Sequence, residues 1–139
     1  MEYGVRKIQP VWTERCERRT EKAERWEKIL ISALKQSRQL WLTELAPAMA
    51  WQDWLNAEEA RSAAGFIAHC EPGEKHYLFD VVPTTAPCWV AIGPEGDFTV
   101  SEIDAACAMG AAAVSLGEQR LRTETAGLAA IQMHALALR

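Results

Sequence analysis

The stretch that decides the fold is WVAIGPEGDFTVSEID, which runs from Trp89 to Asp104. It begins as an apolar strand, continues through a turn built from glycines, a proline and acidic residues, and ends as the start of a helix. Thr99 followed three residues later by Glu102 is the capping-box pattern that begins helices, and Gly110 provides a stop. The stretch therefore predicts a strand, a tight turn and a helix in direct succession.

Strands and helices alternate along the rest of the chain. Short apolar and β-branched runs predict strands over residues 4–14, 40–45, 63–70, 88–93 and 111–117, with a further extended piece over 76–82. Helical spacing and capping signals predict helices over residues 20–36 (from Thr20), 48–61, 99–110 and 124–138, the last one capped by Thr123. This alternation is typical of an α/β fold, a mostly parallel sheet flanked by helices, with 88–93 as a central buried strand.

Size and composition favour one compact domain over residues 1–139. The chain has 139 residues, 49% of them hydrophobic, which is enough for a sizeable core but too short for two ordinary domains. No run approaches the roughly 18 apolar residues of a membrane helix, and the opening MEYGVRKIQP contains no apolar signal core. We therefore expect a soluble, cytoplasmic protein with no membrane partner.

The cysteines and histidines are scattered. Cys16, Cys70, Cys88 and Cys107 form no Cys-x-x-Cys pair, and the three histidines are equally dispersed. We expect reduced, mostly buried thiols and no metal site.

The net charge of -4 is unevenly distributed. Residues 1–30 hold eight Lys/Arg and six Asp/Glu, a balance of +2, so residues 31–139 carry -6. The glutamates interleaved with this basic run could pair with it on the solvated face of a helix. Together with a pI of about 5.4, this makes the run only a weak sign of nucleic-acid binding.

Three loops follow predicted strands and are candidates for a ligand site. They are HCEPGEK (69–75), GPEGDFT (93–99) and LGEQRLRTET (116–125). Ligands of parallel sheets bind beyond the carboxyl ends of the strands, where such loops lie. In the second loop, Gly93 and Gly96 permit dihedrals or close approaches that a Cβ would block. Glu95 and Asp97 would repel an anion and no phosphate-binding motif is present, so a neutral or cationic ligand fits better.

The third loop allows two interpretations. Arg120 and Arg122 could form an exposed basic turn before a helix with Thr123 as its N-cap and Glu124 near the positive end of the helix dipole. Alternatively, two arginines beside a ligand loop are well suited to bind a phosphodiester or an electron-rich base.

These residues carry a family resemblance. IGPEGDFTVSEI together with VSLGEQRLRTETAGLAA closely resembles the paired motifs of the 16S ribosomal RNA uridine N3-methyltransferases, members of the SPOUT superfamily. GVRKIQPVWTERC, RWEKILISALKQS and FIAHCE match the same family upstream and in order. The resemblance implies S-adenosylmethionine as cofactor, small-subunit ribosomal RNA as substrate, a C-terminal trefoil knot, and a homodimer whose active site draws on both subunits.

The resemblance also implies site residues. Carried over by motif, the cofactor-binding residues would be Ala68, His69, Ile92, Gly93, Glu95, Gly96, Leu116, Gly117, Arg120, Leu121 and Arg122. The chemistry of the implied reaction makes Arg122 the first candidate for stabilising the anion of the uracil, and Glu124 a candidate for positioning Arg122 or accepting the proton. Gly110 and Gly127 would be packing positions.

The sequence departs from the family at its front. Family members carry an N-terminal PUA-like domain, and their first catalytic strand and helix precede the segment that matches EYGV, so the domain resembles one truncated at its N-terminal end. The alternative function is therefore a dimerising cofactor-binding remnant without RNA methylation, and a generic nucleotide-binding module is a third candidate. The apolar stripe of the closing helix fits either dimerisation or core packing; it comprises Leu128, Ile131, Ala135 and Leu138, with Ala129 and Leu136 beside it.

Overall fold

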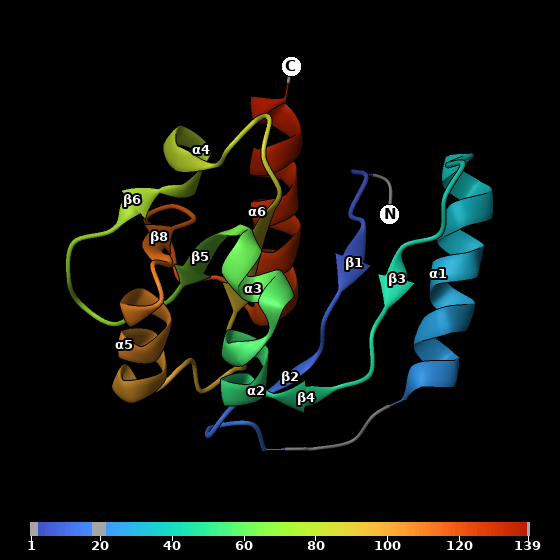
Figure 1. Ribbon diagram of the computed structural model, residues 1–139. Coiled ribbons are helices and arrows are strands. Elements are labelled where there is room, and N and C mark those ends of the chain that lie inside the picture. Colours follow the sequence, from blue (N-terminus) through green and yellow to red (C-terminus); the bar gives the residue numbers. More distant parts are fainter. Residues whose placement is uncertain (1–2, 18–21, 139) are drawn as a thin grey trace.

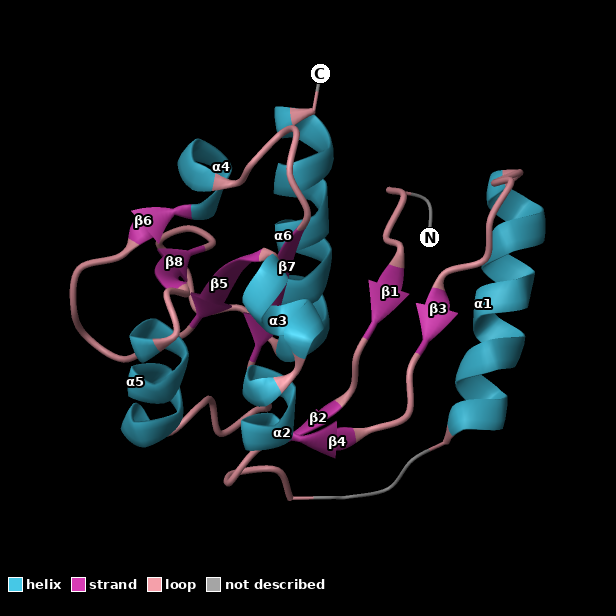
Figure 2. Ribbon diagram, viewed as in Figure 1, coloured by secondary structure: helices cyan, strands magenta, loops and turns pink. Residues whose placement is uncertain are grey.

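The chain folds around a four-stranded parallel sheet, as the computed structural model shows for residues 3–17 and 22–138 (Figures 1 and 2). The strands lie in the order β6-β8-β5-β7 and every pairing is parallel. Their bounds are β5 Ala64–Ala68, β6 His76–Tyr77, β7 Cys88–Ile92 and β8 Ala112–Ser115. The predicted α/β class with a mostly parallel sheet is confirmed.

The strand register brings three loops together at the carboxyl ends of the strands. At the carboxyl end of β5, Ala68 is paired with Ile92 of β7 on one side and with Val114 of β8 on the other. Because the strands are parallel, the segments that leave β5, β7 and β8 all emerge at this end of the sheet.

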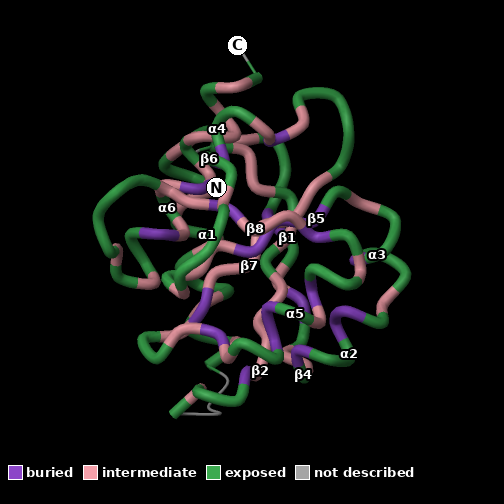
Figure 3. Tube along the Cα trace, turned by 90° about the vertical axis from the view of Figure 1, so that its left-hand side faces the viewer, coloured by how far each residue is buried: buried purple, intermediate pink, exposed green. Residues whose placement is uncertain are grey.

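Helices cover both faces of the sheet. Phe66 and Ile67 are successive buried residues of β5 and therefore point to opposite faces. Ile67 belongs to a cluster with residues of α2 (Trp51–Asn56), α3 (Glu58–Ser62) and α5 (Val100–Ala108). Phe66 belongs to a cluster with residues of α4 (Leu78–Val81) and α6 (Thr123–Ala137). Figure 3 shows the corresponding buried segments in α2, in α5 and around β5 and β8.

A second, thinner part of the fold lies beside this core. It contains the parallel pairs β1 (Lys7–Ile8) with β3 (Glu44–Leu45) and β2 (Val11–Trp12) with β4 (Met49–Ala50). The helix α1 (Ala23–Ser37) lies outside β3 in Figure 1 and has no buried residue. An ion pair between Lys7 and Glu59 links β1 to α3, and its hydrogen bond is the main reason that the pKa of Lys7 is raised.

Several predicted elements change in the structure. The short buried strand predicted over 4–14, with Pro10 at its end or at an edge, divides around Gln9 and Pro10 into two short strands that are not buried. The strand over 40–45 shortens to β3, the helix over 48–61 divides at Ala57, and 76–82 forms β6 followed by α4. The prediction of 88–93 as a central buried strand is wrong: β7 is an outer strand with only partly buried residues, since β5 and β8 occupy the centre of the sheet. Thr20, the expected start of the first helix, lies outside the described residues.

The expected burial of the thiols is also wrong. Cys70 and Cys107 are exposed and Cys16 and Cys88 are partly buried, although all four cysteines are free of disulfides. Burial raises the pKa of Cys88, and burial followed by the charge of Asp104 raises that of Cys107. Within the described residues, no helix has the length and apolar character needed to cross a membrane.

Candidate functional site

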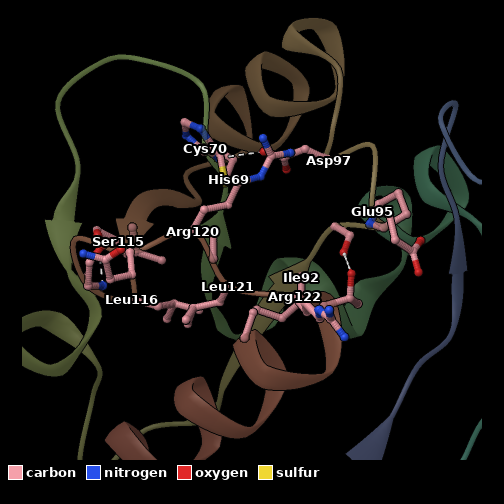
Figure 4. A pocket seen from close by; sticks show the side chains of 18 of the residues that line it. His69, Cys70, Ile92, Glu95, Asp97, Ser115, Leu116, Arg120, Leu121 and Arg122 are labelled. Atoms are coloured by element: carbon pink, nitrogen blue, oxygen red, sulfur yellow. Dashed lines mark hydrogen bonds between the residues drawn. The ribbon is translucent and has the colours of Figure 1, made fainter.

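The three predicted loops line a cavity of about 880 Å³ at the carboxyl edge of the sheet (Figure 4). His69, Cys70 and Asp97 lie on one side of this cavity, and Leu121 and Arg122 lie on the other. The predicted residues that line it are Ala68, His69, Ile92, Gly93, Glu95, Leu116, Gly117, Arg120, Leu121, Arg122 and Glu124. The convergence of the three loops, expected from the parallel strands, is confirmed.

Asp97 joins the first loop to the second. Its Oδ2 accepts the Cys70 backbone N–H at 2.7 Å and its Oδ1 accepts the Phe98 N–H at 2.7 Å. Asp97 has a φ of 60°, the left-handed region that non-glycine residues seldom adopt. An added Cβ at Gly93 would lie 2.9 Å from Asp97 Oδ1, so this turn needs a glycine there for a close approach.

Thr123 joins the second loop to the third. Its hydroxyl donates to the Gly93 carbonyl oxygen at 2.9 Å. The prediction that Thr123 caps the closing helix is wrong, because α6 begins at Thr123 and its N-cap is Arg122. The hydroxyl that sequence reasoning assigned to the helix end thus fastens α6 to the end of β7.

Lys75 closes the first loop on itself. Its Nζ donates to the carbonyl oxygens of His69 at 2.9 Å and Glu71 at 2.7 Å. Sequence reasoning missed Lys75 as a residue of the cavity wall, although its place in a glycine-containing loop was a usable signal.

His69 places two polar atoms in the cavity wall. Within the described part of the chain, its Nδ1 and Nε2 are buried without a hydrogen-bond partner. Burial, and then the charge of Lys75, lower the pKa of His69 below 6.5, whereas Asp97 and Glu71 act in the opposite direction. Burial therefore favours the neutral form of the imidazole.

The N-terminal segment supports the second loop from outside the cavity. Arg15 Nη1 donates to the carbonyl oxygens of Gly96 at 2.9 Å and Phe98 at 3.3 Å. An added Cβ at Gly96 would lie 3.1 Å from Arg15 Cβ, so Gly96 faces Arg15 and is the one predicted cofactor residue that does not line the cavity. No sequence signal links positions this far apart.

A buried carboxylate reinforces this support. Glu102 accepts the Thr99 N–H at 2.9 Å in the predicted capping box, which is confirmed, and the Glu14 N–H at 2.8 Å. Glu102 thus fixes the end of the second loop at Thr99 and ties it to the N-terminal segment. The stop at Gly110 is confirmed by its φ of 93°, whereas Gly110 and Gly127 are not packing positions, because an added Cβ at either would meet nothing within 4 Å.

Charges of both signs line the cavity. Arg120, Arg122 and Glu124 are exposed, and none of their side chains takes part in an ion pair with the residues described. The remaining charged residues of the lining are Lys75, Glu95, Asp97 and Glu118. Such a cavity suits a polar ligand with a positive centre better than a polyphosphate. Across residues 3–17 and 22–138, no group of three His, Cys, Asp or Glu side chains is arranged to hold a metal ion.

Comparison with known proteins finds matches among RNA methyltransferases. The family model described as RNA methyltransferase domain matches residues 1–135. The chain is 30% identical over 140 residues to the ribosomal RNA small subunit methyltransferase E of Synechocystis, and the match covers 97% of this chain and 46% of that protein. The corresponding protein of Rickettsia conorii is 30% identical and 52% covered, so the chain spans about half the length of these curated relatives.

Solved structures resemble the fold closely. A probable rRNA methyltransferase from Porphyromonas gingivalis has a TM-score of 0.89 and 38% identity, covering 99% of this chain and 60% of that one. A ribosomal RNA small subunit methyltransferase E from Neisseria gonorrhoeae, bound to S-adenosyl methionine, has a TM-score of 0.81 and 35% identity over 94% of this chain and 54% of that one. Because the family model spans nearly the whole sequence and the structural likeness covers the same residues, this chain belongs to the family of RNA methyltransferase domains, as its two motifs predicted.

Proposed function

We propose that this domain binds S-adenosylmethionine in the cavity and methylates N3 of a uridine in 16S ribosomal RNA. The observation that carries the proposal is the convergence of the three loops on one cavity, fastened to one another by Asp97 and Thr123. The relative from Neisseria gonorrhoeae supports the cofactor, because its structure contains that molecule. The curated relatives support ribosomal RNA as substrate.

The cavity fits this cofactor in size and chemistry. Its volume of about 880 Å³ lies within the roughly 300–1,000 Å³ that is usual for small-molecule sites. The unpartnered ring nitrogens of His69 offer hydrogen bonds, and the carboxylates of Glu95 and Asp97 tolerate a positive centre. When bound, the cofactor supplies an electrophilic methyl group on a sulfonium centre. The residues that would hold it are Ala68, His69, Ile92, Gly93, Glu95, Leu116, Gly117, Arg120, Leu121 and Arg122, with Gly96 shaping the turn from behind.

Arg122 and Glu124 would serve the acceptor base. Uracil N3 must lose its proton to become a nucleophile, and the negative charge then spreads over the ring oxygens. A guanidinium at the cavity edge stabilises that charge, which is the role of Arg122. Glu124, two residues further on, positions Arg122 or accepts the proton. The absence of an ion pair at either side chain in the described structure leaves both groups available for these roles.

The test is methylation of small ribosomal subunits, with N3-methyluridine measured by mass spectrometry. We expect Arg122→Ala to lower turnover by roughly 100-fold, the scale for loss of one group that stabilises developing charge. Arg61→Ala is the matched control, because Arg61 lies on α3 and does not line the cavity. Unchanged turnover in Arg122→Ala with intact cofactor binding would refute the role of Arg122.

The same assay separates the alternative function. A dimerising remnant would bind S-adenosylmethionine in a calorimetric titration and yield no methylated uridine. Tight binding of a nucleoside triphosphate in place of S-adenosylmethionine would instead favour a nucleotide-binding module.

We further propose a homodimer, a C-terminal trefoil knot and a cytoplasmic location, where the ribosomal RNA of the proposed reaction is found. The exposed leucines Leu128 and Leu136 of α6, and Leu138 at its C-cap, support a dimer interface on that helix. The family resemblance supports the knot, and the hydrogen bond from Thr123 to Gly93 places the segment that follows β8 against the end of β7. Light scattering would report a monomer mass if the dimer proposal is wrong, and an experimental chain trace would show whether the loop is threaded.

A further inference from the structure

We propose that Asp97 is a positioning residue of the cofactor site, a clamp that holds the first loop against the second. This inference rests on the proposed function, since the ligand whose binding it supports is S-adenosylmethionine. Asp97 does not need to contact the ligand for this role. It acts through the backbone of Cys70 and Phe98, and through them on the shape of the cavity wall.

The Asp97 carboxylate binds the backbone of both loops. The two oxygens accept two backbone N–H groups at 2.7 Å, one from Cys70 and one from Phe98. Cys70 lies 27 positions before Asp97 in the sequence, so the carboxylate fastens together two loops that are distant along the chain. Arg15 also bridges these loops, through its bonds to the second loop and a 3.9 Å ion pair with Glu71 of the first. Charge-assisted hydrogen bonds of this kind are short and are about twice as strong as neutral ones.

The backbone of Asp97 forms a tight turn in a left-handed conformation. Its N–H donates to the Pro94 carbonyl oxygen at 2.9 Å, which closes the turn between these residues. Its φ of 60° is a conformation that a glycine adopts without strain and that an L-residue adopts at a cost. A glycine would therefore serve the turn better if only the turn mattered. The side chain compensates for this cost by making the two bonds that a glycine cannot make.

The surroundings of Asp97 place the clamp at the cavity. Asp97 lines the cavity, and an added Cβ at Gly93 would clash with its Oδ1. The Cys70 amide that it holds follows directly after His69, whose unpartnered ring belongs to the same wall. Loss of the clamp would thus free the Cys70 amide and loosen the wall next to His69, while the Lys75 bond to the His69 carbonyl oxygen and the support by Arg15 would remain.

Three variants of Asp97 separate the effect of its side-chain hydrogen bonds from the effect of its backbone strain. Asp97→Gly removes the clamp and relieves the backbone, Asp97→Ala removes the clamp and keeps the strain, and Asp97→Asn keeps one acceptor oxygen. We expect the affinity for S-adenosylmethionine, measured by calorimetry, to fall about tenfold in Asp97→Gly and Asp97→Ala, the scale of one to two lost hydrogen bonds, and to fall less in Asp97→Asn. Thermal stability without ligand should follow a different order, with Asp97→Gly above Asp97→Ala. Asp104→Ala, an exposed acid of α5 outside the cavity, is the control and should bind as the wild type does.

Amide hydrogen exchange of the free protein gives a readout that does not depend on the ligand. The Cys70 amide should exchange slowly in the wild type and faster in Asp97→Gly. Wild-type affinity in Asp97→Gly, or unchanged exchange at Cys70, would overturn the positioning role. Failure of the wild type itself to bind S-adenosylmethionine would refute the proposed function, and the exchange result would then show separately whether the clamp exists.

Discussion

At the scale of single residues, the site depends on polar groups whose partners come from distant parts of the chain. His69 differs from Asp97, Thr123 and Lys75, because its buried ring nitrogens have no hydrogen-bond partner among the described residues. An imidazole in that position is favoured in its neutral form, since burial penalises the charged one.

This state of His69 predicts how stability depends on pH. Its pKa in the folded protein is lowered below 6.5, the value expected for the unfolded chain. Below pH 6.5 the unfolded state therefore binds more protons than the folded state, so the free energy of unfolding falls as pH falls towards the lowered pKa. Above pH 6.5 the effect is absent. Urea unfolding at pH 7 and at about pH 5.5 measures the difference.

His69→Gln provides the comparison. Glutamine does not titrate, so the variant should lose less stability between the two pH values than the wild type. The same loss in both proteins would show that His69 does not contribute to the pH dependence.

At the scale of elements, the contact between β5 and β7 is set by a glycine. A Cβ added at Gly65 would lie 2.4 Å from Cζ2 of the Trp89 ring, and the Trp89 indole is held in place by a 3.0 Å hydrogen bond to the Ala60 carbonyl oxygen. We expect Gly65→Ala to destabilise the protein by about 1–3 kcal/mol, the usual cost of overpacking. Chemical denaturation would measure this change.

Gly127 offers a matched control for the same substitution. It lies in α6 with nothing within 4 Å of an added Cβ, so Gly127→Ala should stabilise the protein by roughly 0.5–1 kcal/mol through helix propensity. Equal effects of the two substitutions would contradict the contact between Gly65 and Trp89.

At the scale of the whole molecule, stability is unevenly distributed. The helix α1 buries no residue, and the strands between it and the core are two residues long. Elements with few buried apolar contacts open at low free energy. We therefore expect the amides of α1 to exchange with solvent much faster than those of β5, as measured by hydrogen exchange in the native protein. Equal protection of the two elements would show that α1 is anchored by contacts other than those described.

Local signals predicted the sheet and the loops well, because they depend on neighbouring residues. Short patterns predicted the capping box at Thr99 and Glu102 and the strand over 63–70. They also predicted that three loops meet at the carboxyl ends of the strands. The position of β7 at the edge could not be predicted, since strand order depends on pairings between residues far apart in the sequence.

The site shows the same division. Residues in motifs were predicted to line the cavity and do so, with the exception of Gly96. The bonds that hold the loops together were missed. Thr123 was assigned to a helix cap and bonds Gly93, and Arg15 supports a turn more than 80 positions away. Such partners are decided by the fold, and no local spacing encodes them.

The bonds from Asp97 to Cys70 and from Thr123 to Gly93 have a consequence for engineering. In each bond, a side chain of one loop binds a backbone group of the neighbouring loop. A chimaera whose imported second loop lacks the Asp97 carboxylate, or whose third loop lacks the Thr123 hydroxyl, would leave the Cys70 N–H or the Gly93 carbonyl oxygen without this partner. Redesign of substrate preference in this domain should therefore retain Asp97 and Thr123, or exchange the loops that they join as one unit.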